Sequence, residues 1–311
     1  MPVIAVVLLA AGGLLTACGS GSGDRQPTAS GSANALVAPG RTQEYLPGLT
    51  ADIVDSATPG PGPVVVLVPG GGWTSADPSG LVPLAASLAA AGMTVVLVTY
   101  RTATSGTYYP GPLQDVTCAV AFAAARATPG VAPRPLVVVG HSAGANLAAL
   151  AVLVPQRAAT CPYPPAVPDA LVGLAGPYDV AALPEGVALF GTTAGDAPRL
   201  WAAGNPLTHA ASRPAVPVLL LHGKADDVVP VSFTTQFAAA LTAGGHRVTV
   251  DLVAGADHSG IYRSDVAAPR LVEWIDHLRP PASSAGVSAR TAGPPGPPRR
   301  RTTTPPPRAP R

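Results

Sequence analysis

The sequence predicts an α/β domain in which a mostly parallel sheet carries helices on both of its faces. Short runs of Val and Leu alternate with segments of helix length, a pattern typical of strands that are buried on both sides. The segments after several of these runs contain side chains typical of catalytic sites, and parallel sheets bind ligands where their strands end. We therefore expect one catalytic domain over residues 43–279.

The predicted elements alternate along this domain, and each follows from its composition. A strand is expected where branched apolar residues form a short run, and a helix where a longer Ala-rich stretch follows. Strands are expected at residues 51–56, 64–68, 94–99, 136–139, 171–174, 218–221 and 248–253. Helices are expected at residues 81–91, 113–127, 143–154, 232–243 and 268–278.

Residues 177–215 break this alternation, and we expect them to form a small cap or loop region over a pocket. Phe190 and Trp201 lie in this region, and Trp73 lies after an earlier strand. These aromatic side chains either line the pocket or belong to the core, and both interpretations stay open at this point.

The segment after the strand at 136–139 has the pattern of a catalytic serine. It reads Gly-His-Ser-Ala-Gly at 140–144 and precedes a predicted helix, so Ser142 lies at a strand-to-helix turn. Such a turn lifts the serine oxygen clear of the sheet, and the flanking glycines allow close approach of the backbone. Ser142 is therefore the candidate nucleophile, and His141 is expected to point away from it.

The loops after two later strands supply a candidate acid and a candidate base. Asp226 and Asp227 follow one strand, and either carboxylate could orient a histidine. His258 follows the last strand and could act as general base toward Ser142. The order Ser, Asp, His along the chain is that of one large class of hydrolases. His222, which precedes the two acids, is expected to be structural.

A glycine run supplies candidate donors for an oxyanion hole. The strand at 64–68 leads into Pro-Gly-Gly-Gly-Trp at 69–73, and consecutive glycines let backbone N–H groups turn toward a site. The N–H of Ala143, directly after the nucleophile, is the expected second contribution. Loss of one such donor typically lowers kcat by roughly 10²- to 10³-fold.

Several further motifs accompany these three segments. The motifs are residues 70–73, 100–101, 113–116, 140–144, 176–179, 205–209, 222–230 and 257–258. With them the chain resembles bacterial α/β-hydrolase carboxylesterases that carry an HGGGW-type oxyanion motif. That group includes hormone-sensitive-lipase-like, feruloyl-esterase-like and kynurenine-formamidase-like enzymes.

The resemblance implies a role for particular residues. It assigns the acid to Asp226 rather than Asp227, and the oxyanion donors to the N–H groups of Gly71, Gly72 and Ala143. One position departs from the family pattern, because Pro69 stands where the family usually has a histidine that braces the loop. The oxyanion hole of this chain is therefore expected to be held in a different way.

The expected function is hydrolysis of small or medium acyl esters by a Ser-His-Asp acyl-enzyme mechanism. This chemistry needs neither a metal nor an organic cofactor. Two alternatives stay open: an amide hydrolase of the same fold, such as a formamidase or a peptidase, and a surface lipoprotein that binds a ligand with weak catalysis. The expected partner is a small-molecule ester, and the oligomeric state is open.

The N-terminus has the pattern of a bacterial export signal. Residues 3–15 are mostly apolar and too short to span a bilayer as a helix. Leu-Thr-Ala-Cys at 15–18 resembles a lipobox, which implies a signal peptide at 1–17, lipidation of Cys18 and a flexible linker at 18–42. The chain is therefore expected to be anchored to the outer face of the cell membrane, or secreted.

Export changes the interpretation of the two remaining cysteines. Cys118 and Cys161 are an even pair, which in an oxidising compartment favours a disulfide, although two unrelated buried thiols remain an alternative. Neither has neighbours at the spacing of metal ligands, so a zinc site is rejected.

The charge of the chain is concentrated in its C-terminal tail. The formal net charge is +2, and residues 280–311 contain six Arg and no acid. The Arg are interspersed with Pro, which is typical of a disordered and solvated segment, so no nucleic-acid partner is expected.

Overall fold

The structure, a computed structural model, describes residues 40–58, 60, 62–126 and 135–278. The predicted signal peptide with Cys18, most of the linker and the tail at 280–311 lie outside the described residues. No helix of the described part is both long and apolar enough to cross a membrane.

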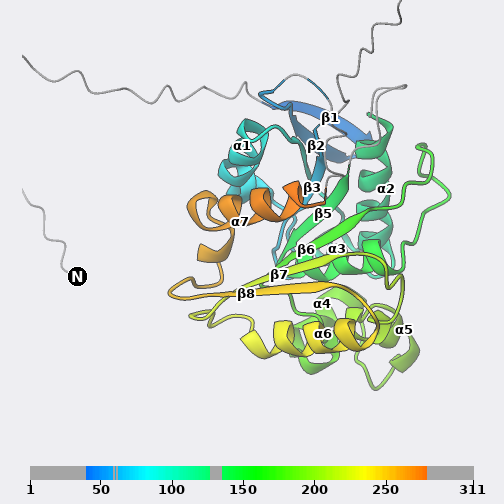
Figure 1. Cartoon of the computed structure of the whole chain (residues 1–311). Helices are drawn as coiled ribbons and strands as arrows, with labels where there is room; N and C mark the ends of the chain where they lie inside the picture. The colour runs from blue at the N-terminus through cyan, green and yellow to red at the C-terminus, as the bar shows by residue number, and fades with distance from the viewer. Residues whose placement is uncertain (1–39, 59, 61, 127–134, 279–311) are drawn as a thin grey trace, which may run out of the picture. The chain divides into compact units, whose positions relative to one another are not determined.

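In the described residues, eight strands form one sheet, in the order β1-β2-β4-β3-β5-β6-β7-β8. The first two pairings are antiparallel and all later ones are parallel, which confirms the predicted mostly parallel sheet (Figure 1). The strands are β1 Arg41–Leu46, β2 Leu49–Val54, β3 Val64–Val68, β4 Thr94–Val98, β5 Leu136–His141, β6 Ala170–Leu174, β7 Val218–Gly223 and β8 Val248–Val253.

Helices cover both faces of this sheet, as the sequence predicts. The helices are α1 Val82–Ala90, α2 Gly111–Ala125, α3 Ala143–Leu153, α4 Val187–Phe190, α5 Pro198–Ala203, α6 Val231–Ala243 and α7 Ser264–Asp276. α1 and α7 pack on one face, and α2, α3 and α6 pack on the other (Figure 1).

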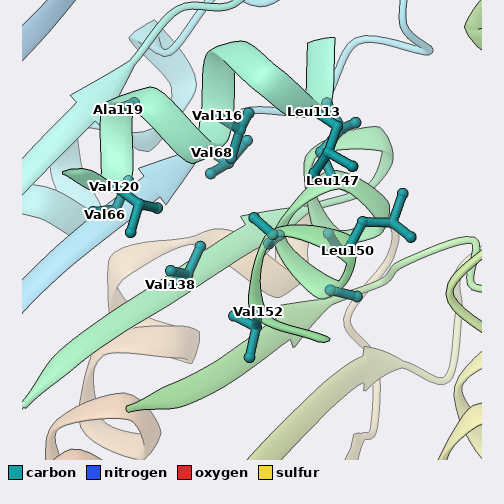
Figure 2. Packing of buried hydrophobic residues seen from close by; sticks show 14 of the residues in the cluster. Val66, Val68, Leu113, Val116, Ala119, Val120, Val138, Leu147, Leu150 and Val152 are labelled. Atoms are coloured by element: carbon teal, nitrogen blue, oxygen red, sulfur yellow. The ribbon is translucent and has the colours of Figure 1, made fainter. Parts of the chain in front are cut away.

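The core follows from the alternation of side chains along each strand. In β3, Val66 and Val68 face the helix pair α2 and α3, whereas Val65 and Leu67 face α1 and α7. Figure 2 shows Val66 and Val68 among apolar side chains of α2 and α3. In a strand that is buried on both faces, no side chain reaches solvent. The central strands are therefore continuous apolar runs in the sequence.

The segment expected as a cap forms short helices that pack into the core. It contains α4, α5 and the 3-10 helices Val180–Ala182, Pro184–Gly186 and Pro206–His209. Phe190 and Trp201 are 4% exposed and stack on each other at 4.4 Å between ring centroids. Both belong to the core on the side of α2 and α3, as does Trp73, so of the two interpretations the structure favours core.

Candidate active site

Ser142 occupies the sharp turn that the sequence predicts. β5 ends at His141 and α3 begins at Ala143, so one residue reverses the chain direction. Ser142 has φ 53° and ψ −125°, a conformation that typically costs about 1–3 kcal/mol for a residue with a side chain. Its N–H donates to the carbonyl of Leu174 on β6 at 2.9 Å, which ties the turn to the sheet.

The two glycines of the Gly-His-Ser-Ala-Gly segment are required by close backbone contacts. A Cβ atom at Gly140 would lie 2.2 Å from the carbonyl oxygen of Gly144. A Cβ atom at Gly144 would lie 2.3 Å from the carbonyl oxygen of Val68. Any side chain at either position would push the start of α3 away from β3 and β5.

Ser142, His258 and Asp226 form a chain of hydrogen bonds. His258 Nε2 lies 2.9 Å from Ser142 Oγ, and His258 Nδ1 lies 2.8 Å from Asp226 Oδ2. The three residues follow β5, β8 and β7, whose carboxyl ends lie at one edge of the parallel sheet. The structure thus brings together the three residues that the sequence selects.

Asp226, and not its neighbour, is the carboxylate that reaches the histidine. Its side chain is 0% exposed, whereas Asp227 is an exposed residue. Burial alone would raise the pKa of Asp226, but the hydrogen bonds that it accepts from His258 and from the backbone N–H groups of Val229 and Val228 outweigh burial and lower the pKa. Asp226 is therefore ionised at neutral pH.

His141 lies closer to this site than its expected orientation suggests. Its Nε2 lies 2.9 Å from the carbonyl oxygen of His258, and the two imidazole rings are 4.8 Å apart. Because the ring is buried, the pKa of His141 falls to about 4, so the imidazole is neutral and donates this hydrogen bond. His141 thus supports the loop that carries His258.

The glycine loop after β3 lies beside the nucleophile because β3 pairs with β5. Gly71 has φ 127° and Gly72 has φ 58°, and a Cβ atom at Gly71 would lie 2.5 Å from the carbonyl oxygen of Ser75. Among the hydrogen bonds of the described residues, none uses the N–H of Gly71 or Gly72 as a donor. Ala143 is the first residue of α3, where helix N–H groups have no intrahelical partner.

Tyr100 braces this loop, a role that the sequence pattern does not predict. Its side chain is 3% exposed, and its hydroxyl donates to the carbonyl oxygen of Pro69 at 2.9 Å. The N–H of Ala103 donates to the carbonyl oxygen of Trp73 at 2.9 Å. The loop is therefore held by the segment that follows β4. The Tyr-Arg motif at 100–101 was the available signal, but it gives no partner.

A cleft of about 480 Å³ contains Ser142 and His258. Its walls come from the loop after β3, the β5–α3 turn, and the loops after β7 and β8, and they include Asp77, Val228 and Tyr262. None of its lining residues lies in 177–215. The segment therefore does not line this cleft, and several of its apolar side chains are buried in the core.

Two further expectations concern the cysteines and metals. The structure joins Cys118 of α2 to Cys161, in the segment between α3 and β6, by a disulfide with 5.6 Å between the Cα atoms. In the part of the chain that the structure describes, no group of three or more His, Cys, Asp or Glu side chains could hold a metal ion.

A mostly parallel sheet with helices on both faces and a Ser-His-Asp hydrogen-bond chain at its carboxyl edge defines an α/β-hydrolase. The sequence pattern of the BD-FAE family matches residues 52–241, which is more than half of the chain. The protein therefore belongs to the BD-FAE family.

Curated relatives carry esterase names. The chain is 31% identical over 196 residues to the probable carboxylic ester hydrolase LipM of Mycobacterium tuberculosis, a match that covers 57% of this chain and 44% of LipM. It is 29% identical over 228 residues to esterase LipQ of the same organism, covering 68% of this chain and 54% of LipQ. The chain thus spans about half the length of the curated relatives that it matches.

Solved structures support the fold. A truncated carbohydrate esterase from gut microbiota superposes with a TM-score of 0.67 at 18% identity, covering 78% of this chain and 98% of that one. The esterase Est2 of Thermogutta terrifontis, in a propionate-bound structure, gives a TM-score of 0.62 at 23% identity, covering 78% and 94%. At these identities the likeness shows the α/β-hydrolase fold alone.

Proposed function

We propose that this protein hydrolyses carboxylic esters through an acyl-enzyme formed on Ser142. The observation that carries the proposal is the hydrogen-bond chain from Ser142 Oγ through His258 to the buried Asp226. Hydrolases use this chain to activate a serine oxygen that is otherwise a weak nucleophile. The esterase names of the curated relatives support the same reaction class.

The first step transfers a proton from Ser142 to His258. His258 Nδ1 faces an ionised carboxylate at 2.8 Å and therefore carries the hydrogen of the neutral ring, which leaves Nε2 free to accept the proton of Ser142 Oγ at 2.9 Å. As the oxygen attacks the ester carbonyl, Asp226 stays ionised and stabilises the positive charge that develops on the imidazole.

The negative charge on the substrate oxygen is stabilised by backbone donors. We assign these donors to the N–H groups of Gly71, Gly72 and Ala143. The assignment is supported by the position of the glycine loop on β3, next to β5, and by the position of Ala143 at the N-terminus of α3. A helix N-terminus carries partial positive charge, which favours an oxyanion there.

His258 then completes the cycle as acid and as base. The imidazolium gives its proton from Nε2 to the leaving alcohol, and the C–O bond of the ester breaks. Water enters, His258 accepts one of its protons, and the hydroxide attacks the acyl group on Ser142. The tetrahedral intermediate formed by this attack then collapses, which releases the carboxylic acid, and the proton held by His258 returns to Ser142.

The cleft favours esters with small or medium acyl groups. It measures about 480 Å³, and its walls combine Leu81, Val228 and Tyr262 with the polar residues Ser75 and Asp77. A long acyl chain is held best by a continuous apolar channel, whereas this lining mixes apolar and polar residues. Structures of the similar esterase Est2 contain propionate and butyrate, which are acids of this size class.

The test uses the full chain and its Ser142→Ala variant with p-nitrophenyl esters from acetate to palmitate. We expect the highest kcat/KM for short acyl groups and loss of turnover in the variant. A fluorophosphonate should label the wild type and leave Ser142→Ala unlabelled. Turnover of anilides but of no ester would favour the amide hydrolase alternative. Absence of both turnover and label would favour a ligand-binding lipoprotein.

We also propose that the protein is exported and anchored by a lipid on Cys18. The apolar run at 3–15 and the lipobox-like Leu-Thr-Ala-Cys support this, and a disulfide between Cys118 and Cys161 suits an oxidising compartment. The test is fractionation of cells that express wild type or Cys18→Ser. We expect the wild type in the membrane fraction with a lipid mass on Cys18, whereas equal fractionation of both would contradict the anchor.

A further inference from the structure

A second imidazole contacts the carboxylate that serves the triad. Asp226 Oδ2 lies 2.8 Å from His258 Nδ1 and 3.1 Å from His222 Nε2. The side chains of His222 and Asp226 are both 0% exposed, so water does not compete for this contact. His222 lies on β7, four residues before the acid, and does not line the cleft.

The contacts of His222 define where its hydrogen lies. Nε2 faces two oxygens that can only accept, the carbonyl of Val229 at 2.8 Å and Asp226 Oδ2 at 3.1 Å. Nε2 must therefore carry a hydrogen, which it donates to the carbonyl of Val229 while the carboxylate oxygen of Asp226 lies beside the same N–H group. Nδ1 lies 2.7 Å from the hydroxyl of Thr234, which is buried in α6.

The ring of His222 is neutral in this environment. Burial lowers its pKa, although the carbonyl of Val229 and the carboxylate of Asp226 act in the opposite direction. In a neutral ring with hydrogen on Nε2, Nδ1 is an acceptor, and the hydroxyl of Thr234 is its donor. This one tautomer gives a hydrogen-bond partner to both ring nitrogens of His222 and to the hydroxyl of Thr234.

The carboxylate of Asp226 accepts three hydrogen bonds and has one further polar contact. Oδ1 accepts from the N–H groups of Val228 at 2.9 Å and Val229 at 2.8 Å, and Oδ2 accepts from His258 Nδ1 and lies 3.1 Å from His222 Nε2. Together these contacts fix the position and the rotation of the carboxylate group. Oδ2 therefore points at His258 before any substrate binds.

We infer that His222 is a positioning residue of the triad, which holds Oδ2 of Asp226 toward His258 through its neutral Nε2–H tautomer. The inference rests on the proposed role of Ser142, His258 and Asp226 in ester hydrolysis. Because His222 does not contact the cleft, it acts on the chemical step and hence on kcat, and it leaves KM almost unchanged.

The test compares two replacements of similar length. His222→Gln keeps an N–H donor at about the distance of Nε2, whereas His222→Met fills the space without a donor. Thr234→Val is the matched control for the tautomer, since it removes the hydroxyl that faces Nδ1 and leaves the donor to Asp226 in place. Circular dichroism and thermal unfolding of each full-length variant establish that it is folded at the assay temperature.

We expect kcat of His222→Met to fall about 10- to 100-fold, the range that follows from loss of one N–H contact to a buried charged group. KM should change less than about 2-fold, His222→Gln should recover most of the lost kcat, and Thr234→Val should lose less than His222→Met. Wild-type kcat in folded His222→Met would overturn the inference. So would an equal loss in the Met and Gln variants.

A second measurement does not depend on turnover. The proton between His258 Nδ1 and Asp226 Oδ2 should give a far-downfield proton resonance in the wild type, and this resonance should move or broaden in His222→Met but persist in His222→Gln. An unchanged resonance in His222→Met would overturn the inference. A wild type that shows the resonance but neither turns over esters nor reacts with a fluorophosphonate would contradict the proposed function instead.

Discussion

His141 links the stability of the fold to pH, because its ring is buried beside the site and is neutral there. The residue is 7% exposed and its Nε2 donates to the carbonyl of His258. Burial is the main reason why its pKa falls from 6.5 to about 4, and the nearby His258 adds to this effect. The carbonyl of His258 and the carboxylate of Asp226 act in the opposite direction, and His222 again lowers the pKa.

The sign follows from the protons that each state binds. Between pH 6.5 and about 4 the unfolded chain takes up a proton on His141 and the folded chain does not, so the free energy of unfolding falls as the pH falls. Above pH 6.5 neither state is protonated there, and the contribution is constant. The slope approaches ~1.4 kcal/mol per pH unit, so acidification from about pH 7 to about pH 5 should cost about 2 kcal/mol through this residue.

The assay is urea unfolding of wild type and His141→Gln across this pH range. Gln keeps an N–H for the carbonyl of His258 but does not titrate, so the variant should lose about 2 kcal/mol less than the wild type between about pH 7 and about pH 5. His277→Gln is the matched control, because His277 is exposed on the surface. Parallel stability curves for wild type and His141→Gln would refute the reasoning.

Three further predictions concern the acid, the glycine loop and the cleft. Asp226→Asn should lower kcat roughly 10⁴-fold and Asp227→Asn only a few-fold, since Asp226 alone of the two contacts His258. Steady-state kinetics of both variants measures this difference, and equal losses of kcat would contradict the assignment of the acid. Tyr100→Phe leaves the buried carbonyl of Pro69 without its hydrogen-bond donor, so kcat should fall about 10-fold with little change in KM. A variant with wild-type kcat would show that Tyr100 does not hold the glycine loop in place. Asp77→Asn removes an exposed carboxylate from the cleft, so kcat/KM for a negatively charged hemisuccinate ester should rise a few-fold at low salt. The gain should vanish at high salt, and kcat/KM for the uncharged acetate ester should not change. A gain that persists at high salt would contradict a charge effect.

Central strands such as β3 could be predicted from the sequence because every residue in them is apolar and buried, and the expectation at 64–68 coincides with β3. The expectation at 248–253 coincides with the edge strand β8, in which only Val253 is buried. β1 was missed, since Arg-Thr-Gln-Glu-Tyr-Leu contains mostly polar residues and only Tyr45 is buried. Tyr45 is buried through contacts with distant elements, among them a hydrogen bond to the carbonyl of Thr99, and a local pattern does not contain such contacts.

The triad could be selected from the sequence because each member lies in the turn or loop that follows a parallel strand. The supporting contacts of His141, His222 and Tyr100 could not be predicted in this way. Each joins segments that are far apart in the chain, as in the sequence separation of 117 between His141 and His258. Which donor meets which acceptor depends on the strand order, and in particular on β3 lying between β4 and β5.

The same strand order explains how this chain tolerates Pro69 at the position where the carboxylesterases that it resembles usually have a histidine. Proline has no N–H to donate, but its carbonyl can still accept, and Tyr100 in the segment after β4 donates to it at 2.9 Å. The N–H of Ala103 holds the carbonyl of Trp73 at the other end of the loop. The loop is thus held at both ends through its own carbonyl groups, and this leaves the N–H groups of the intervening Gly71 and Gly72 without a partner among the described residues. A brace on the carbonyls therefore leaves available the glycine N–H groups that we propose as oxyanion donors, which a bond to those N–H groups would not do.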